Sequence, residues 1–229
     1  MKRKENSKSG ELFNKLVRKA TLKQKVYRNT LVTLNLLKNG MNSMVYEYDA
    51  LKSTEAKKIP FTYRDRGEFD AELKFAGDTL VFMMHTNVFE IPRDHEVMNT
   101  SYIREDRDRS YCGIISIFNF LSDSFKYNRL NDIGYLIGRV MVNKDMHYFT
   151  EGKREIGFLY NSFGVSEMNE QSAAEILHSA IYYTINFDLL VPPYDDVKMV
   201  SVQEFITAID SMQLKTGKRL GFKFQADKD

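Results

Sequence analysis

The stretch YCGIISIFNFL, residues 111–121, constrains the fold more than any other segment, because it is long and almost entirely apolar. Its β-branched and aromatic side chains predict a buried strand. Ile114, Ile117, Phe118 and Leu121 also recur at helical spacing, so the pattern leaves strand and helix both open. In either conformation the segment is expected to be buried against other elements of the fold.

The segments after it alternate between helical and strand patterns. Residues 131–143 carry apolar side chains at helical spacing after Asn131, a residue type favoured at a helix N-cap, so a helix is expected there. Strands are expected at 146–151 and 154–160, and a further helix at 169–187. If residues 131–143 form a crossover helix, the strands on either side of it can pair in parallel.

Turn and cap residues mark the remaining elements. Residues 71–92 alternate apolar and polar side chains around Gly77-Asp78, which predicts a β-hairpin with a two-residue turn. Ser201 and Glu204 have the spacing of a capping box, and residues 219–225 suit an edge strand. Together the patterns predict an α+β fold. Its mainly antiparallel sheet has about five to six strands packed by helices, with a long N-terminal helical segment.

The N-terminal segment has a pronounced helical pattern. Residues 1–10 are polar and predict a disordered basic tail, while 11–52 predict a helical segment ahead of a single globular α+β domain at 60–229. Whether Gly40 breaks this helix is left open. Near-apolar side chains form a heptad-like stripe: Tyr27, Thr30, Leu34, Leu37, Met41, Met44, Tyr48 and Leu51. Threonine and tyrosine suit a coiled-coil seam poorly, so packing on the protein's own domain is favoured over a coiled-coil dimer.

Charge is distributed unevenly along the chain. Residues 1–40 contain eleven Lys and Arg against two Glu, a net charge of +9, whereas the other residues sum to −7 and the whole chain to +2. A basic arm on an acidic body predicts an anionic partner, which can be nucleic acid, an anionic membrane or the body of a second copy. The candidate nucleic-acid contacts in this arm are Lys15, Arg18, Lys19, Lys23, Lys25 and Arg28.

Composition narrows the cellular setting. The single cysteine, Cys112, excludes an intramolecular disulfide, and without an N-terminal signal peptide it favours a reducing, cytoplasmic location. No apolar run reaches the roughly 18 residues of a transmembrane segment. The four histidines are scattered and there is no glycine-rich phosphate loop, so no metal site and no cofactor is predicted.

Glu151-Gly152-Lys153 has the Glu-x-Lys spacing that many metal-dependent nucleases place on one strand. Combined with an upstream acid, Asp78 or Asp145, Glu151 could hold a divalent cation while Lys153 helps to organise the attacking water. The competing interpretation is a hairpin in which Gly152 and Lys153 form the turn and Glu151 pairs with Arg154 across it. Lys153 would then lie at the exposed tip, so the hairpin is favoured and the nuclease is kept as an alternative.

Three polar residues in apolar surroundings are candidate binding residues. Arg139 lies within LIGRVMV, and its charge must reach solvent, a carboxylate or an anionic ligand. Asn119 interrupts IFNFL and needs hydrogen-bond partners if it is buried. His147 is expected on the same hairpin face as Glu151. The loop REDRDRS, residues 104–110, alternates in sign, which predicts a surface loop whose charges compensate one another.

The absence of any assembled catalytic spacing favours a binding function over catalysis. The leading hypothesis is a non-enzymatic, intracellular binding or scaffold module that self-associates or docks another protein through its N-terminal helix. One alternative is a metal-dependent, nuclease-like enzyme acting on nucleic acid. The other is a non-catalytic nucleic-acid binder that uses residues 1–40.

Overall fold

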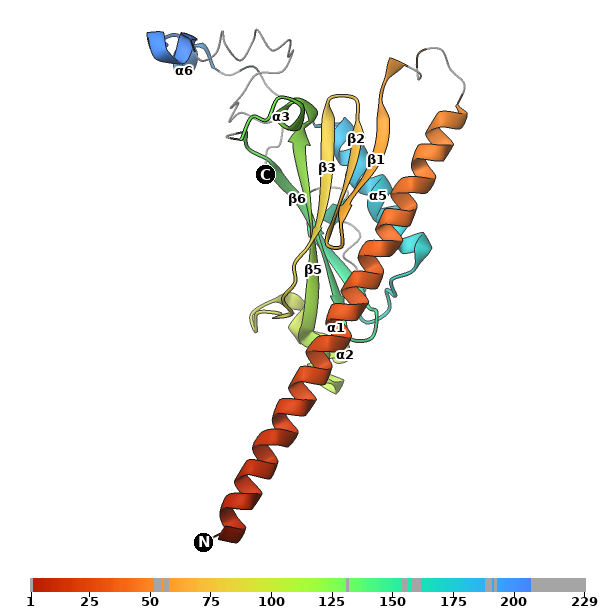
Figure 1. The fold of residues 1–229 in the computed structure, drawn as a ribbon, viewed down its shortest axis with the longest axis vertical. Helices are drawn as coiled ribbons and strands as arrows, with labels where there is room; N and C mark the ends of the chain where they lie inside the picture. Colours follow the sequence, from red (N-terminus) through yellow and green to blue (C-terminus); the bar gives the residue numbers. More distant parts are fainter. Residues whose placement is uncertain are drawn as a thin grey trace.

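The computed structural model describes residues 2–51, 55, 58–130, 132–153, 156–157, 162–187, 191 and 193–206 of the 229-residue chain. Its elements, in chain order, are α1 Lys2–Ala50, β1 Phe61–Gly67, β2 Asp70–Phe75, β3 Asp78–Met84, β4 Phe89–Glu90, η2 Glu96–Asn99, α2 Ser101–Glu105, η3 Arg107–Ser110, β5 Tyr111–Leu121, α3 Ser122–Lys126, β6 Tyr135–Asn143, β7 Tyr148–Gly152, α5 Glu170–Ile185 and α6 Tyr194–Val197 (Figure 1).

A single antiparallel sheet organises the body. Its strand order is β1-β2-β3-β5-β6-β7, with the short β4 also pairing with β5, and each of these pairs is antiparallel. The predicted α+β class with a long N-terminal helix is therefore confirmed, and the seven strands slightly exceed the predicted five to six.

Residues 111–121 form a central strand, β5, which settles the choice between strand and helix. Ile115 and Ile117 point to the face covered by α1 and α5, where they join the main hydrophobic core. Cys112 and Ile114 belong to a second, smaller core on the opposite face, beneath the segment that joins β4 to β5. The sheet is thus buried on both sides at this end, which explains why its sequence pattern lacks a clean alternation.

The predicted helix at 131–143 is wrong, because residues 135–143 form strand β6 between β5 and β7. Val140 and Val142 enter the main core while Met141 enters the second, so consecutive apolar residues are buried on opposite faces. Such a run imitates helical spacing, and only its neighbours distinguish the two conformations. The possible parallel pair is excluded as well, since β6 is antiparallel to both neighbours.

The predicted turns are partly displaced. The β2–β3 turn consists of Ala76-Gly77, one residue earlier than predicted, because Phe75 pairs directly with Asp78. The strand expected at 146–151 is β7, and it pairs with β6. The nitrogen of Ile156 donates to the Lys153 carbonyl at 3.2 Å in a helical turn, so the strand expected at 154–160 is not formed at residues 156–157. The strand predicted at 219–225 lies outside the described residues.

Helix α1 continues without a break through Gly40. This glycine lies against α5, and a Cβ atom there would come within 2.7 Å of the Leu177 side chain. Its role is therefore close helix packing rather than helix termination. The predicted stripe packs on the protein's own sheet, since Thr30, Leu34, Leu37 and Met41 are fully buried. The backbone is helical from Lys2 onward, whereas the sequence predicts a disordered tail at 1–10.

Helix α5 confirms the element expected at 169–187. Its N-cap residue Asn169 accepts a hydrogen bond from the nitrogen of Ser172 at 2.9 Å. The predicted capping box is also formed: Ser201 donates from its nitrogen to Glu204 at 2.8 Å, and Glu204 donates in return to the Ser201 hydroxyl at 3.1 Å. None of the helices in the described part of the chain combines the length and apolarity that a membrane crossing requires.

Candidate functional site

The four residues of the predicted nuclease site do not converge. Asp78 begins β3 and pairs with Leu121 at the end of β5, whereas Asp145 follows β6 beside the start of β5. Nine residue steps of extended strand separate these positions, which is roughly 30 Å. The nitrogen of Lys153 donates to the Ile137 carbonyl at 3.1 Å. Within the described ranges, no group of three His, Cys, Asp or Glu side chains is arranged to hold a metal ion.

Glu151 has two partners that bring distant parts of the chain together. Arg139, directly opposite on β6, forms an ion pair with one carboxylate oxygen. His95 lies 3.1 Å from the other oxygen through Nε2, and its Nδ1 accepts a hydrogen bond from the nitrogen of Val97. Because Nδ1 is an acceptor, Nε2 carries the proton that is donated to Glu151. The predicted pair with Arg154 falls on a residue outside the described ranges.

The other two candidate binding residues lie elsewhere. The ring of His147 stacks on Tyr102 at 4.9 Å, and its Nδ1 lies 3.0 Å from the Phe163 carbonyl oxygen. Asn119 is buried near the far end of β5, where it pairs with Leu80 and Tyr135. Its side-chain oxygen has no hydrogen-bond partner among the described residues. Only Arg139 and Glu151 therefore meet, and the four residues do not form one cleft.

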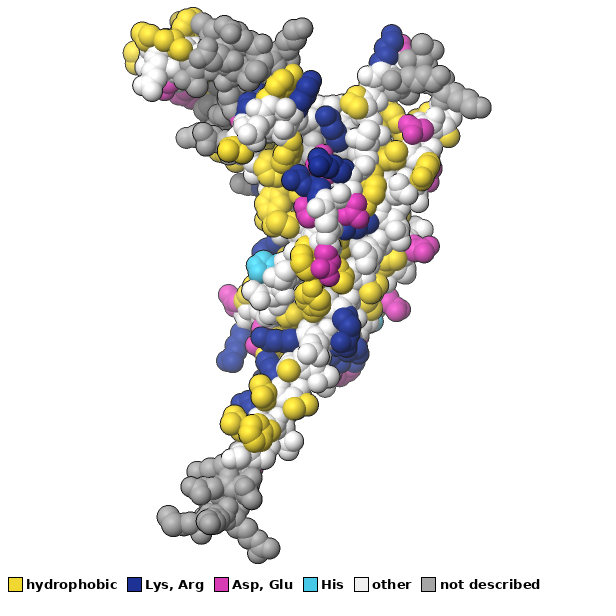
Figure 2. All heavy atoms as spheres, viewed as in Figure 1, with side chains coloured by type: hydrophobic (Ala, Val, Ile, Leu, Met, Phe, Trp, Pro, Cys, Tyr) yellow, Lys and Arg dark blue, Asp and Glu magenta, His cyan; other side chains and the backbone are white. Residues whose placement is uncertain are grey.

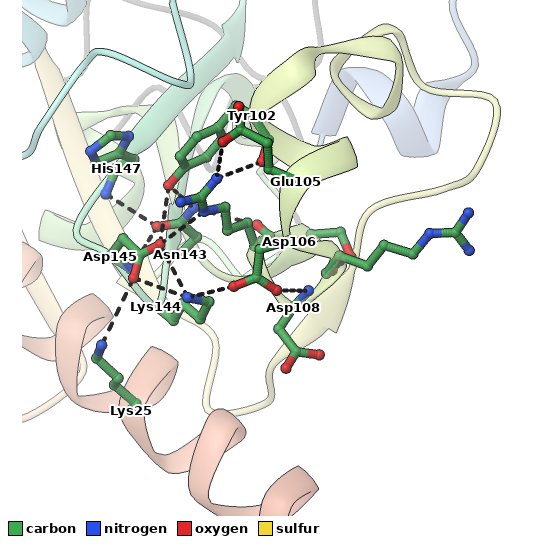
Figure 3. A network of polar contacts seen from close by, with 12 residues as sticks. Lys25, Tyr102, Glu105, Asp106, Asp108, Asn143, Lys144, Asp145 and His147 are labelled. Carbon is green, nitrogen blue, oxygen red and sulfur yellow. Dashed lines mark hydrogen bonds and ion pairs between the residues drawn. The ribbon is translucent and has the colours of Figure 1, made fainter.

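A polar network surrounds Asp145 in the turn between β6 and β7 (Figure 3). Its carboxylate accepts hydrogen bonds from Lys144 at 3.1 Å, from Arg109 at 3.3 Å and from the Tyr102 hydroxyl at 3.4 Å. Lys25 approaches from α1 to 3.8 Å. The network fastens α1 and the 101–110 segment to the same turn.

The buried residue Asn143 holds this turn in shape. Its side-chain oxygen accepts hydrogen bonds from the backbone nitrogens of Asp145 and His147, at 2.9 and 3.2 Å. Its side-chain nitrogen donates to the Tyr102 hydroxyl at 3.0 Å, which places the Tyr102 ring against His147. A single buried amide thereby sets the positions of several groups in the network.

The ionisation of the network supports a structural role. Burial raises the pKa of Asp145, but hydrogen bonds and charge from Lys144, followed by Arg109 and Lys25, outweigh it, so the pKa lies below its ordinary value of 3.8. The hydrogen bond from Lys144 likewise lowers the pKa of Asp106. Both carboxylates therefore stay ionised at neutral pH and are poorly suited to transfer protons. Burial raises the pKa of the Cys112 thiol far above its ordinary value, which makes it unreactive.

The charges of the 104–110 loop compensate one another only in part, because Asp106 and Asp108 pair with residues outside the loop. Arg109 pairs with Glu105 at 3.1 Å, Asp106 with Lys144 at 3.0 Å, and Asp108 with Arg18 at 2.9 Å. Lys19 contacts the Tyr111 hydroxyl and lies over its ring. Three of the six predicted nucleic-acid contacts therefore bind other residues of this chain: Arg18, Lys19 and Lys25.

The first part of α1 extends beyond the body, and we refer to residues 9–21 as the projecting segment (Figure 1). Every residue in it is exposed, and Leu22, which follows it, is buried. Four large apolar side chains lie on one side of it, with Leu12, Phe13, Leu16 and Val17 exposed by 63%, 59%, 62% and 63%. Figure 2 shows hydrophobic side chains gathered on this part of the helix.

A second exposed apolar surface lies on the outer side of α5. A hollow of about 410 Å³, which we name the α5 groove, is lined by His178, Ser179, Ile181, Tyr182 and Ile185. Tyr182 and Ile185 are largely exposed. The groove lies within a stretch, residues 155–197, that contains seven Asp and Glu and no Lys or Arg.

The two apolar surfaces were not predicted from the sequence. Leu12, Phe13, Leu16 and Val17 have a visible helical spacing, but Ala20 and Lys23 interrupt it before the stripe that begins at Tyr27. The outward position of Tyr182 and Ile185 depends on which side of α5 faces the sheet. Comparisons of the chain with protein-family models, with curated proteins and with solved structures give no match.

Proposed function

We propose that this protein is a non-enzymatic scaffold module that self-associates head to tail, with the projecting segment of one copy docking into the α5 groove of the next. The observation that carries the proposal is the exposed apolar side of the projecting segment, formed by Leu12, Phe13, Leu16 and Val17. A contiguous exposed apolar patch on a helix is a common mark of an interaction surface. Helix-in-groove docking uses side chains spaced by three and four residues in this way.

Charge complementarity supports a second copy as the partner. The projecting segment carries Lys15, Arg18 and Lys19 against Glu11, whereas α5 itself carries Glu170 and Glu175 and no Lys or Arg. A basic helix is attracted to such a surface, and two basic helices of the same kind repel each other. Pairing of two projecting segments is therefore disfavoured.

The size of the surface predicts a weak interaction. Burying four large apolar side chains contributes roughly 1.5–3 kcal/mol each. Association costs about 4–15 kcal/mol in lost translational and rotational freedom, so the net free energy of binding is small. Because the docking and receiving surfaces differ, the interface is heterologous and can extend into open chains or close into rings. Reversible, concentration-dependent assembly is expected.

The test uses two double variants of the full chain. Leu12→Glu with Leu16→Glu disables the projecting segment, and Tyr182→Glu with Ile185→Glu disables the α5 groove. Deleting α1 is not suitable, because Leu34, Leu37 and Met41 belong to the core. The readout is molar mass by size-exclusion chromatography with light scattering over a concentration series.

Each double variant is expected to be monomeric, whereas the wild type gains mass with concentration. An equimolar mixture of the two variants should form heterodimers only, because one intact helix and one intact groove remain in the pair. Asn14→Glu with Thr21→Glu adds the same charge on the polar side of the projecting segment and should assemble like the wild type. A wild type that stays monomeric throughout its soluble range sinks the proposal, as does assembly of the Leu12→Glu, Leu16→Glu variant.

A further inference from the structure

A groove runs between α1 and the connection from β3 to β4. It has a volume of about 550 Å³ and is lined on one side by Lys23, Gln24, Tyr27 and Arg28, and on the other by residues 86–89. This volume is within the range of small-molecule sites. Lys23 and Arg28 belong to the predicted nucleic-acid arm, and we refer to this site as the α1–β4 groove.

The groove is cationic. Lys23 and Arg28 are exposed, and neither forms an ion pair with any described residue, in contrast to Arg18 and Lys25 on the same helix. None of its eight lining residues is acidic. Two cations without compensating carboxylates provide a favourable environment for an anionic group.

Aromatic rings and amides complete the lining. Phe89 is 38% exposed and is held edge-on by His85, with ring centroids 4.8 Å apart. Tyr27 is half-buried and packs edge-on against Phe69 at 6.5 Å. The side chains of Gln24 and Asn87 offer both hydrogen-bond donors and acceptors. A nucleotide needs this combination, because its phosphate pairs with cations, its base stacks on rings and its base edge bonds to amides.

We infer that the α1–β4 groove binds a nucleotide unit, with the phosphate between Lys23 and Arg28 and the base against Phe89 or Tyr27. The inference does not depend on self-association, since it uses none of the residues of the proposed interface. The unit can come from a single-stranded nucleic acid or from a free mononucleotide, which share this chemistry. An acidic polypeptide lacks the planar base and would use the cations alone.

The test is fluorescence anisotropy of the full chain with fluorescein-labelled oligo(dT). Lys23→Ala with Arg28→Ala should weaken binding by about tenfold or more and lower the slope of log K against log salt by about 0.7, which corresponds to one phosphate neutralised on a single strand. Phe89→Ala should weaken binding by about tenfold through lost stacking while leaving the salt slope unchanged. All three residues are exposed, so the variants are expected to keep the wild-type circular dichroism.

A matched control removes two exposed cations outside the groove, Lys58→Ala with Arg64→Ala, and should change affinity by at most about threefold because of screening. Competition by ADP would support the inference and assign the site to mononucleotides. Binding of the oligonucleotide without ADP competition would support it and assign the site to single strands. The inference is overturned if neither probe binds, if polyglutamate binds as well as the oligonucleotide, or if the control weakens binding as much as the groove variant.

Discussion

Helix α1 contains two parts that look alike as sequence and have different surroundings. Residues 22–41 place Leu22, Val26, Leu34, Leu37 and Met41 in buried positions against the sheet and α5. The projecting segment carries equally apolar side chains at the same kind of spacing, yet no described part of the body covers them. Helical periodicity therefore predicts a helix and an apolar side, but it does not say whether that side meets the chain's own core or another molecule.

The difference between the two parts of α1 is tested most directly by replacing one leucine in each part with alanine and comparing the losses of stability. Leu34→Ala should lower the free energy of unfolding by about 2–5 kcal/mol, because it leaves a cavity at a fully buried position. Leu16→Ala should change it by no more than about 0.5 kcal/mol. Urea denaturation at low protein concentration, where any assembly is dissociated, gives both values. Equal losses would mean that the projecting segment is packed in the monomer.

Substitutions at two glycines, Gly113 and Gly40, test how closely α1 packs on β5 and on α5. A Cβ atom at Gly113 of β5 would lie 2.0 Å from the Thr30 hydroxyl oxygen, and this short β-branched side chain cannot move away. Gly113→Ala should therefore cost about 1–3 kcal/mol. At Gly40 the nearest atom is the end of the flexible Leu177 side chain, and alanine gains about 1 kcal/mol of helix propensity.

Gly40→Ala should thus be near neutral in the same denaturation assay, within about 0.5 kcal/mol. Its comparison with Gly113→Ala separates a contact with the short, β-branched Thr30 side chain from a contact with the flexible end of the Leu177 side chain. If Gly40→Ala were the more damaging of the two, the crossing of α1 over β5 at Thr30 would not be the tighter contact.

A smaller effect than those of Leu34→Ala and Gly113→Ala is expected where Lys25 of α1 approaches Asp145. Asp145 has a pKa lowered by Lys144, Arg109 and Lys25 against the opposing effect of burial. Its stabilising contribution is therefore fully present above its unfolded pKa and is lost as the pH falls through the lower folded pKa. Asp145→Asn should cost about 1 kcal/mol at pH 7, and the difference from the wild type should narrow below the ordinary value of 3.8.

Thermal unfolding at a series of pH values measures this difference. Asp108→Asn is the matched control, since its partner Arg18 on the projecting segment is 77% exposed, and it should cost no more than about 0.5 kcal/mol at pH 7. A constant gap between Asp145→Asn and the wild type from pH 7 to pH 2.5 would contradict the role given to the charge of Asp145.

Much of the fold was predictable, and the largest error in the prediction has a clear physical cause. The long helix, the strand at 111–121, the helix at 169–187 and the capping box at Ser201 follow from local patterns. The pattern at residues 131–143 predicts a helix because the apolar side chains of strand β6 enter cores on both faces of the sheet. Burial on both sides removes the period of two that marks a strand.

The site was predicted less well for a related reason. Arg139 was expected to need a carboxylate or an anion, and Glu151 was expected to need a cation, but their pairing requires β6 to lie beside β7. Because residues 131–143 have the pattern of a helix, the sequence does not predict that β6 pairs with β7. His95, 56 residues away in the chain, joins Glu151 only because the segment after β4 folds back over the sheet.

By itself, the sequence determined a long basic helix, a mainly antiparallel sheet with helices, and an uneven charge of +9 against −7. These properties depend on composition and on periods of two to four residues, which neighbouring positions in the chain establish. Only the tertiary structure decided which basic residues remain unpaired and which apolar side of α1 is covered. Those outcomes depend on contacts between residues far apart in the chain, such as Arg18 with Asp108 and Thr30 with Gly113, which no local pattern encodes.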